Sequence, residues 1–119
     1  MNNRSVEKEI ERITKKVAAK FQPEKVILFG SWVWGHPVPG SDVDLFVVKK
    51  SRRKTLDLMR QVDRILLDRV LPLDILVYTP NQLKRRLELG DPFVKKILSE
   101  GRVLYDKIAE DSSTGRRVA

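Results

Sequence analysis

The most constraining feature of the sequence is a glycine-serine pair followed, after ten residues, by two aspartates at alternate positions. The pair Gly30-Ser31 ends the apolar run of residues 26–29, and the aspartates are Asp42 and Asp44. An apolar run that stops at glycine predicts a strand and a turn, and the serine then predicts a helix N-cap. In an extended segment, alternation places both aspartates on one face. The sequence therefore predicts a backbone turn beside two carboxylates that point the same way.

Two such carboxylates need a partner, because their Cα atoms lie only ~6.6 Å apart and the charges repel by roughly 2–3 kcal/mol at an effective dielectric near 20. A divalent cation removes this cost, and carboxylate oxygens suit Mg²⁺, with Mn²⁺ as the alternative. Mg²⁺ typically shares such acids with substrate phosphates, which the Gly30-Ser31 turn can approach through its backbone. The layout predicts a site for a metal-bound nucleoside triphosphate. The other interpretation is that Asp42 and Asp44 cap a helix or anchor a loop.

A third carboxylate, Asp74, interrupts the apolar segment of residues 72–78. Burial disfavours an unpaired carboxylate in such a strand, so Asp74 requires a partner. We expect the metal site to supply it, and a neighbouring Lys or Arg is the alternative.

The remaining patterns alternate between helical and extended spacing. Strands are predicted over residues 25–29, 42–48, 72–78 and 102–106. Helices are predicted over residues 4–21, 31–34, 80–90 and 91–101. A further helix is predicted to be capped by Thr55 and to end before Pro72, and its apolar stripe runs from Leu58 to Val70. The helix from residue 80 follows a capping box formed by Thr79 and Gln82. These elements predict an α/β fold of three or four strands with helices packed on them.

Length and composition favour a single domain over residues 1–106, followed by a flexible tail over residues 107–119. No apolar run approaches the ~20 residues that cross a bilayer, and the charged N-terminal helix is unlike a signal peptide. Zero cysteines exclude disulfides, thiolate zinc sites and cysteine nucleophiles. We therefore expect a cytoplasmic protein without a membrane segment.

The net charge of +8 favours an anionic partner. The densest basic run, residues 49–54, follows the Asp42–Asp44 segment, and it can steer phosphates to the site, bind nucleic acid directly or form a solvated loop. Trp32 and Trp34 can stack on a nucleotide base, form a docking patch or pack on the sheet. No histidine cluster supports zinc catalysis.

With these motifs placed, residues 5–106 resemble the nucleotidyltransferase superfamily of DNA polymerase beta, and within it the minimal nucleotidyltransferase (MNT) domains. The resemblance is carried by Gly30, Ser31, Asp42 and Asp44, with the third carboxylate at Asp74. It implies a small mixed β-sheet of three to four strands flanked by helices, and nucleotidyl transfer from an NTP. It also implies that Asp42 and Asp44 bind two Mg²⁺ ions, and that Asp74 binds the catalytic one and helps to deprotonate an attacking hydroxyl. Gly30 and Ser31 would then bind the β- and γ-phosphates.

Small free-standing domains of this kind resemble the antitoxin partners of HEPN-domain toxins. The resemblance implies transfer of AMP from ATP to a tyrosine of the HEPN ribonuclease, in a hetero-oligomer or from a homodimer. The alternative is a non-catalytic MNT-fold antitoxin or binding module that neutralises its partner by contact. This chain has Trp32 where such antitoxins often have arginine after Gly-Ser.

Overall fold

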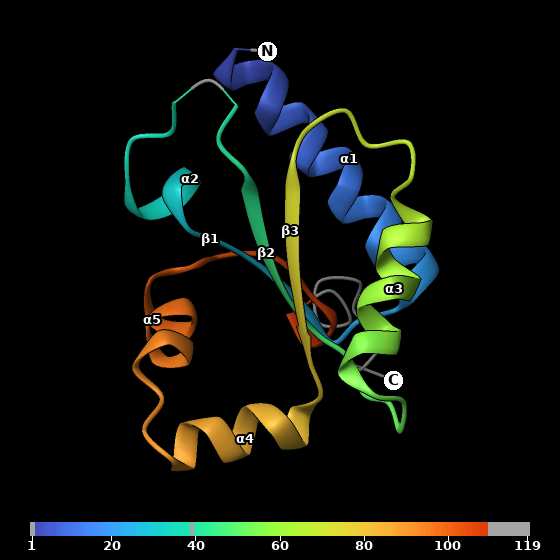
Figure 1. Cartoon of the computed structure of the whole chain (residues 1–119), viewed down its shortest axis with the longest axis vertical. Helices are drawn as coiled ribbons and strands as arrows, with labels where there is room; N and C mark the ends of the chain where they lie inside the picture. Colours follow the sequence, from blue (N-terminus) through green and yellow to red (C-terminus); the bar gives the residue numbers. More distant parts are fainter. Residues whose placement is uncertain (1, 39, 110–119) are drawn as a thin grey trace.

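Four strands from both halves of the chain form one mixed sheet with helices on its two faces (Figure 1). The structure, a computed structural model, describes residues 2–38 and 40–109. The helices are α1 (Asn3–Phe21), α2 (Ser31–Trp34), α3 (Thr55–Ile65), α4 (Pro80–Glu88) and α5 (Pro92–Glu100). The strands are β1 (Lys25–Phe29), β2 (Val43–Val48), β3 (Leu73–Tyr78) and β4 (Arg102–Asp106). The predicted α/β fold with a small mixed sheet is confirmed.

The strand order is β3-β2-β1-β4, so β3 and β4 are the edges of the sheet. Strand β1 is antiparallel to both β2 and β4, whereas β2 and β3 are parallel. A parallel neighbour requires a crossover, and α3 supplies it between β2 and β3. The two strands that carry the candidate aspartates therefore begin at the same end of the sheet.

The larger part of the core lies between the sheet and the helices α1 and α3. The predicted apolar stripe of α1 is confirmed, because its members are all buried: Val6, Ile10, Ile13, Val17 and Phe21. They pack with every second residue of the strands, including Val26, Leu28, Val43, Leu45, Val47, Ile75 and Val77. Asn2 caps the helix, since its Oδ1 accepts the Ser5 N–H at 2.8 Å.

The opposite face of the sheet is covered by α2 and α5, on the left of Figure 1, and by α4, at the bottom. Its apolar cluster contains Ile27, Phe29, Phe46 and Val48 from the strands and Ile97 from α5. Because side chains alternate along β2 and β3, Asp44 and Asp74 share this face with Phe46 and Leu76. The fold thus places both carboxylates at the beginning of an otherwise apolar face.

The predicted start and end of the third helix were wrong. Lys54 is the N-cap of α3, and the Thr55 hydroxyl instead donates to Gln82 Oε1 at 3.0 Å. The helix ends at Ile65, and Val70, which was predicted to lie on its apolar stripe, is 66% exposed. The chain must leave the helix early because residues 66–72 lead back to the start of β3.

The other helix signals agree with the structure to within two residues at their ends. Thr79 and Gln82 form the predicted capping box of α4, and the Asp91 side chain caps α5. Helix α4 ends at Glu88 rather than Gly90, and Gly90 has a φ of +75°. A glycine in this region suits the turn after the helix.

Of the predicted tail, residues 107–109 are helical, and Asp106 Oδ1 accepts the Ile108 N–H at 3.0 Å. Residues 110–119 lie outside the described residues, so the flexible tail stays a prediction. In the described ranges, no helix combines the length and apolarity that crossing a bilayer requires.

A buried carboxylate on α1 holds the loop that leads into β3. Glu9 is 6% exposed, and its two oxygens accept from Arg12 Nε at 2.7 Å and Arg12 Nη2 at 2.8 Å. Glu9 Oε2 also accepts the Val70 N–H at 3.1 Å, and Asp68 contacts Arg12 and Lys16, each at 3.0 Å. The Arg12 hydrogen bonds lower the pKa of Glu9 below its ordinary value, against the opposing effect of burial.

Replacing Glu9 by Gln should lower the free energy of unfolding by about 1–3 kcal/mol, because Arg12 loses the buried one of its two carboxylate partners and keeps only the exposed Asp68. The pKa of Glu9 is lower in the folded than in the unfolded protein, so ionised Glu9 stabilises the fold at pH values above its unfolded-state pKa. This stabilisation is lost as the pH falls through the folded-state pKa of Glu9. Urea unfolding at neutral and acidic pH measures both effects. Glu11→Gln, at an exposed carboxylate paired with Lys15 at 3.2 Å, is the control. Equal losses in the two variants would contradict the assignment.

Candidate active site

The centre of the candidate site is a contact between the backbone of Gly30 and the carboxylate of Asp44. Gly30 follows β1 with a φ of +81°, and a Cβ atom built on it would lie 2.0 Å from Asp44 Oδ2. Only glycine fits this approach and this backbone conformation without strain. Gly30 is also the N-cap of α2, so the prediction that Ser31 caps the helix was wrong, and Ser31 is its first residue. Within the described chain, the helix start uses no side-chain cap, which leaves the serine hydroxyl at the turn.

The structure brings the three predicted aspartates to the N-terminal ends of β2 and β3. Asp44 is half-buried and pairs in register with Asp74 on β3 and with Phe29 on β1. Paired residues of adjacent strands lie about 5 Å apart, so the two acids are direct neighbours. Asp42 is exposed and lies just before β2, which begins at Val43 instead of the predicted Asp42. Asp42 thus adds a third carboxylate two residues from Asp44.

The surroundings of Asp44 disfavour its charged form. Burial raises the pKa of Asp44, and the negative charges of Asp74 and Asp42 raise it further. Asp74 itself is exposed, because β3 is an edge strand. The argument from burial that singled out Asp74 was therefore wrong, although the residue does lie beside Asp44.

The donor chemistry of this cluster fits a hard divalent cation, since the ligands are carboxylate oxygens whose mutual repulsion a cation would relieve. As the side chains stand, no group of three or more His, Cys, Asp or Glu residues in the described part of the chain is arranged to hold a metal ion. Asp44 and Asp74 are the direct neighbours from which such a cation would be held, with Asp42 next to them.

An open hollow of about 760 Å³ lies where β3 begins, and Asp42 is the candidate carboxylate that borders it. It is lined by Asp42, Leu67, Arg69, Val70, Leu71, Pro72 and Leu73. The apolar side chains of its rim reach into solvent, since Leu67 is 79% and Val70 is 66% exposed. Asp44 and Asp74 do not line it, and Leu73, its one residue from β3, packs against the core on the face of the sheet opposite these two acids.

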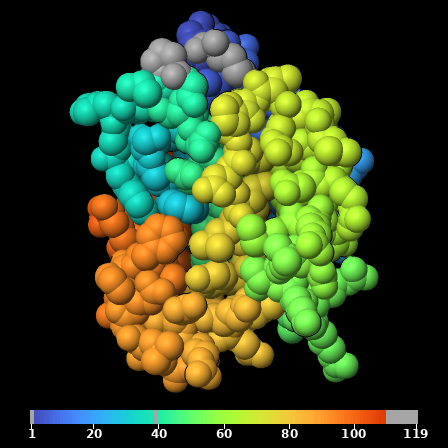
Figure 2. All heavy atoms as spheres, viewed as in Figure 1, coloured from blue at the N-terminus to red at the C-terminus, as the bar shows by residue number. Residues whose placement is uncertain are grey.

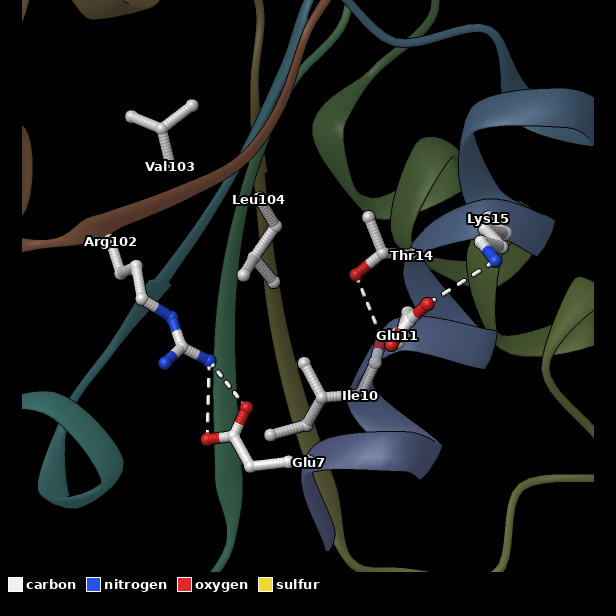
Figure 3. A pocket seen from close by; sticks show the side chains of 8 residues that line it. All are labelled: Glu7, Ile10, Glu11, Thr14, Lys15, Arg102, Val103 and Leu104. Carbon is white, nitrogen blue, oxygen red and sulfur yellow. Dashed lines mark hydrogen bonds and ion pairs between the residues drawn. The ribbon is translucent and has the colours of Figure 1, made fainter. Parts of the chain in front are cut away.

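Figure 3 shows a second hollow, of about 360 Å³, at the other edge of the sheet. Its walls come from α1 and β4, and Arg102 Nη2 lies 2.9 Å from Glu7 Oε2 across it. None of the three candidate aspartates contributes to its walls. It is therefore a separate feature of the surface.

The two tryptophans of α2 pack within the fold. The Trp34 ring lies 5.9 Å from the Phe29 ring, and Lys96 Nζ lies 4.4 Å from its centroid. Figure 2 shows the cyan atoms of α2 meeting the orange atoms of α5. Trp32 is half-buried, and its Nε1 donates to Ser41 O at 3.5 Å, which ties α2 to the loop before β2. Packing is thus the role that the contacts show, and Lys96 had no signal in the sequence because it comes from a distant helix.

The basic run of residues 49–54 lies at the far end of β2 from Asp44. Lys49 is held structurally, because its Nζ donates to Phe21 O at 2.7 Å and to Gln22 O at 3.2 Å. This placement argues against the interpretation that the run steers phosphates to the carboxylates.

Comparisons with known proteins agree with this geometry. Residues 10–105 match the family model described as "Nucleotidyltransferase domain", and the chain therefore belongs to the nucleotidyltransferase domain family. Proteins with such domains generally use a nucleoside triphosphate and a divalent metal ion.

The fold is similar to that in the crystal structure of "a putative nucleotidyltransferase from Sulfolobus solfataricus", with a TM-score of 0.60 and 22% sequence identity. The match covers 84% of this chain and 79% of the other, and at this identity it concerns the fold. Among curated proteins, none matches this chain significantly.

The contact between Gly30 and Asp44 predicts an unequal effect of two glycine substitutions. Gly40 also has a positive φ, +84°, but a Cβ there would meet nothing within 4 Å. Gly40→Ala should therefore cost about 1–2 kcal/mol of backbone strain, whereas Gly30→Ala should cost a further 1–3 kcal/mol, roughly, from overlap with the carboxylate. Chemical unfolding of both variants measures the difference. Equal costs would show that Asp44 does not lie against the turn.

The repulsion among the acids predicts that Asp44→Asn stabilises the metal-free protein by up to about 1 kcal/mol at neutral pH. Because the pKa of Asp44 is raised in the fold, the penalty is present above the folded-state pKa and disappears below the unfolded-state pKa. The gain should therefore shrink as the pH falls. Thermal unfolding at several pH values measures it, with the exposed α3 residue Asp63, changed to Asn, as the control. Destabilisation by Asp44→Asn would contradict the prediction.

Proposed function

We propose that this protein is a magnesium-dependent nucleotidyltransferase that transfers AMP, or another NMP, from an NTP to a protein hydroxyl. In this proposal ATP is the substrate and two Mg²⁺ ions bind at the site. The acceptor is a tyrosine of a HEPN-domain toxin, and the transfer silences that toxin in the cytoplasm. The observation that supports nucleotidyl transfer is the Gly30 backbone against Asp44, with Asp74 beside it. The HEPN acceptor is supported by the sequence resemblance of the Gly30-Ser31 and Asp42–Asp44 motifs to MNT antitoxins.

Each residue of the site has a role in this chemistry. Divalent cations at Asp42, Asp44 and Asp74 would stabilise charge that develops on the phosphate oxygens during transfer. Gly30 allows backbone N–H groups to approach the β- and γ-phosphates, and the Ser31 hydroxyl can donate to them. The exposed Asp74 carboxylate can accept the proton of an incoming hydroxyl.

The position of the open hollow supports a large acceptor. Transfer of a nucleotidyl group requires the attacking oxygen and the leaving phosphate to be roughly in line, on opposite sides of the phosphorus. If the Gly30-Ser31 turn, at the end of β1, holds the leaving phosphates, the acceptor approaches from the side of the edge strand β3, where Asp74 is exposed and the open hollow begins beside Asp42. The exposed Leu67 and Val70 at its rim can pack against the apolar neighbours of a protein hydroxyl.

The test is transfer from labelled ATP, with Mg²⁺, to the protein encoded by the neighbouring gene. The variant Asp42→Asn/Asp44→Asn should transfer at least about 100-fold more slowly, because it loses the carboxylates that would hold the cation. Asp57→Asn/Asp63→Asn removes the same charge from the exposed surface of α3 and should transfer normally. Wild-type transfer no faster than that of the Asp42/Asp44 variant would refute the proposal.

The second candidate is a non-catalytic antitoxin that neutralises its HEPN partner by contact in a hetero-oligomer. It is favoured by Trp32, which packs toward Ser41 at the position where related antitoxins often have arginine. Toxin neutralisation that survives Asp42→Asn/Asp44→Asn, without nucleotide transfer, would select this candidate.

A further inference from the structure

The end of the sheet away from the aspartates carries a cluster of cations from two distant parts of the sequence. Lys50, Arg52, Arg53 and Lys54 lie in the loop between β2 and α3, and Arg85 and Arg86 lie on α4; we call these six residues the basic face. All six are exposed. Figure 1 shows α4 and the start of α3 together at this end, opposite α2.

Hydrogen bonds at both ends of the loop attach it to the segment that contains α4. The Lys49 N–H donates to Tyr78 O at 2.9 Å, and the Thr55 hydroxyl donates to Gln82 Oε1 at 3.0 Å. Arg85 and Arg86 follow Gln82 by three and four residues, so they lie on the same side of α4. The two groups of cations are therefore neighbours on the surface.

Arg85 and Arg86 of the basic face line a hollow of about 350 Å³, together with Tyr78, Gln82 and Leu89. This volume lies in the range of ligand clefts and is sufficient for part of one nucleotide. Guanidinium groups bind phosphate oxygens in a planar, bidentate geometry, and Gln82 adds a polar side chain between them and the loop.

Little negative charge compensates the basic face. Arg86 Nη1 lies 3.8 Å from Asp91 Oδ2, and the other five cations make no ion pair with a described residue. Like charges at this density repel unless a polyanion neutralises them. Four of the six residues are arginines, and three of the six lie consecutively in the loop. Cations spaced in this way can neutralise successive phosphates of a nucleic-acid backbone.

We propose that the basic face binds the phosphodiester backbone of a single-stranded nucleic acid, with one nucleotide entering the hollow beside Tyr78. Tyr78 and Asp74 are four residues apart on β3, so the hollow lies about 13 Å along the strand from the carboxylates. The binding site is therefore separate from the nucleotidyl-transfer site, and substitutions on it leave that site intact.

The test is fluorescence anisotropy of the full-length chain with labelled oligouridylate of about 12 nucleotides, at several salt concentrations. The variant Arg52→Ala/Arg53→Ala/Arg85→Ala should bind at least about 10-fold more weakly, and the slope of log K against log salt should fall by about 2. The control Arg4→Ala/Lys8→Ala/Arg64→Ala removes the same charge at exposed positions on α1 and α3 and should stay within about 3-fold of wild type. Thermal unfolding verifies that both variants are folded.

Oligothymidylate of the same length shows whether the basic face binds DNA as well as RNA. Duplex RNA of the same length tests whether binding requires a single strand. Equal weakening by the two triple variants would show that only net charge attracts the oligonucleotide, and the proposal would fail. Absence of wild-type binding at low salt, or tighter binding of duplex RNA, would also overturn it. Binding of a polyglutamate peptide is measured in the same way. If the Arg52→Ala/Arg53→Ala/Arg85→Ala variant loses affinity for this peptide but not for oligouridylate, the basic face binds an acidic protein instead.

Discussion

The site depends on the close approach of one backbone turn to one half-buried carboxylate. Gly30 can lie over Asp44 only because it has no Cβ and adopts a positive φ. Asp44 in turn is held in register with Asp74 by the parallel pairing of β2 and β3. The arrangement opposes stability, since burial and neighbouring charge raise the pKa of Asp44, and a bound cation would relieve that repulsion.

The rest of the fold maintains this arrangement from outside the site. The pairing of β2 with β3 requires the crossover through α3 and the return along residues 66–72. Glu9 is buried and paired with Arg12, and it accepts a hydrogen bond from the Val70 N–H. This hydrogen bond attaches residues 66–72 to α1. A favourable ion pair on the first helix thereby supports an unfavourable cluster of acids at the sheet edge.

Charge is distributed along the sheet in a way that net charge alone conceals. The aspartates lie at the beginning of β2 and β3, and the basic face lies where the same strands end. The net charge of +8 is thus compatible with an acidic site and a basic surface on one small domain. The assignment to the nucleotidyltransferase domain family accounts for the acidic site. The basic face has the character of a binding surface for a separate anion.

Local patterns in the sequence determined the elements whose signals are complete within a few residues. The stripe of α1 and the capping box of Thr79 and Gln82 depend on periodicity or short-range hydrogen bonds. Only the tertiary structure decided that β3 is an exposed edge, that α3 stops before Val70 and that Lys96 reaches Trp34. These features come from contacts between segments far apart in the chain, and no local periodicity records which strand pairs with which or how a helix returns to the sheet.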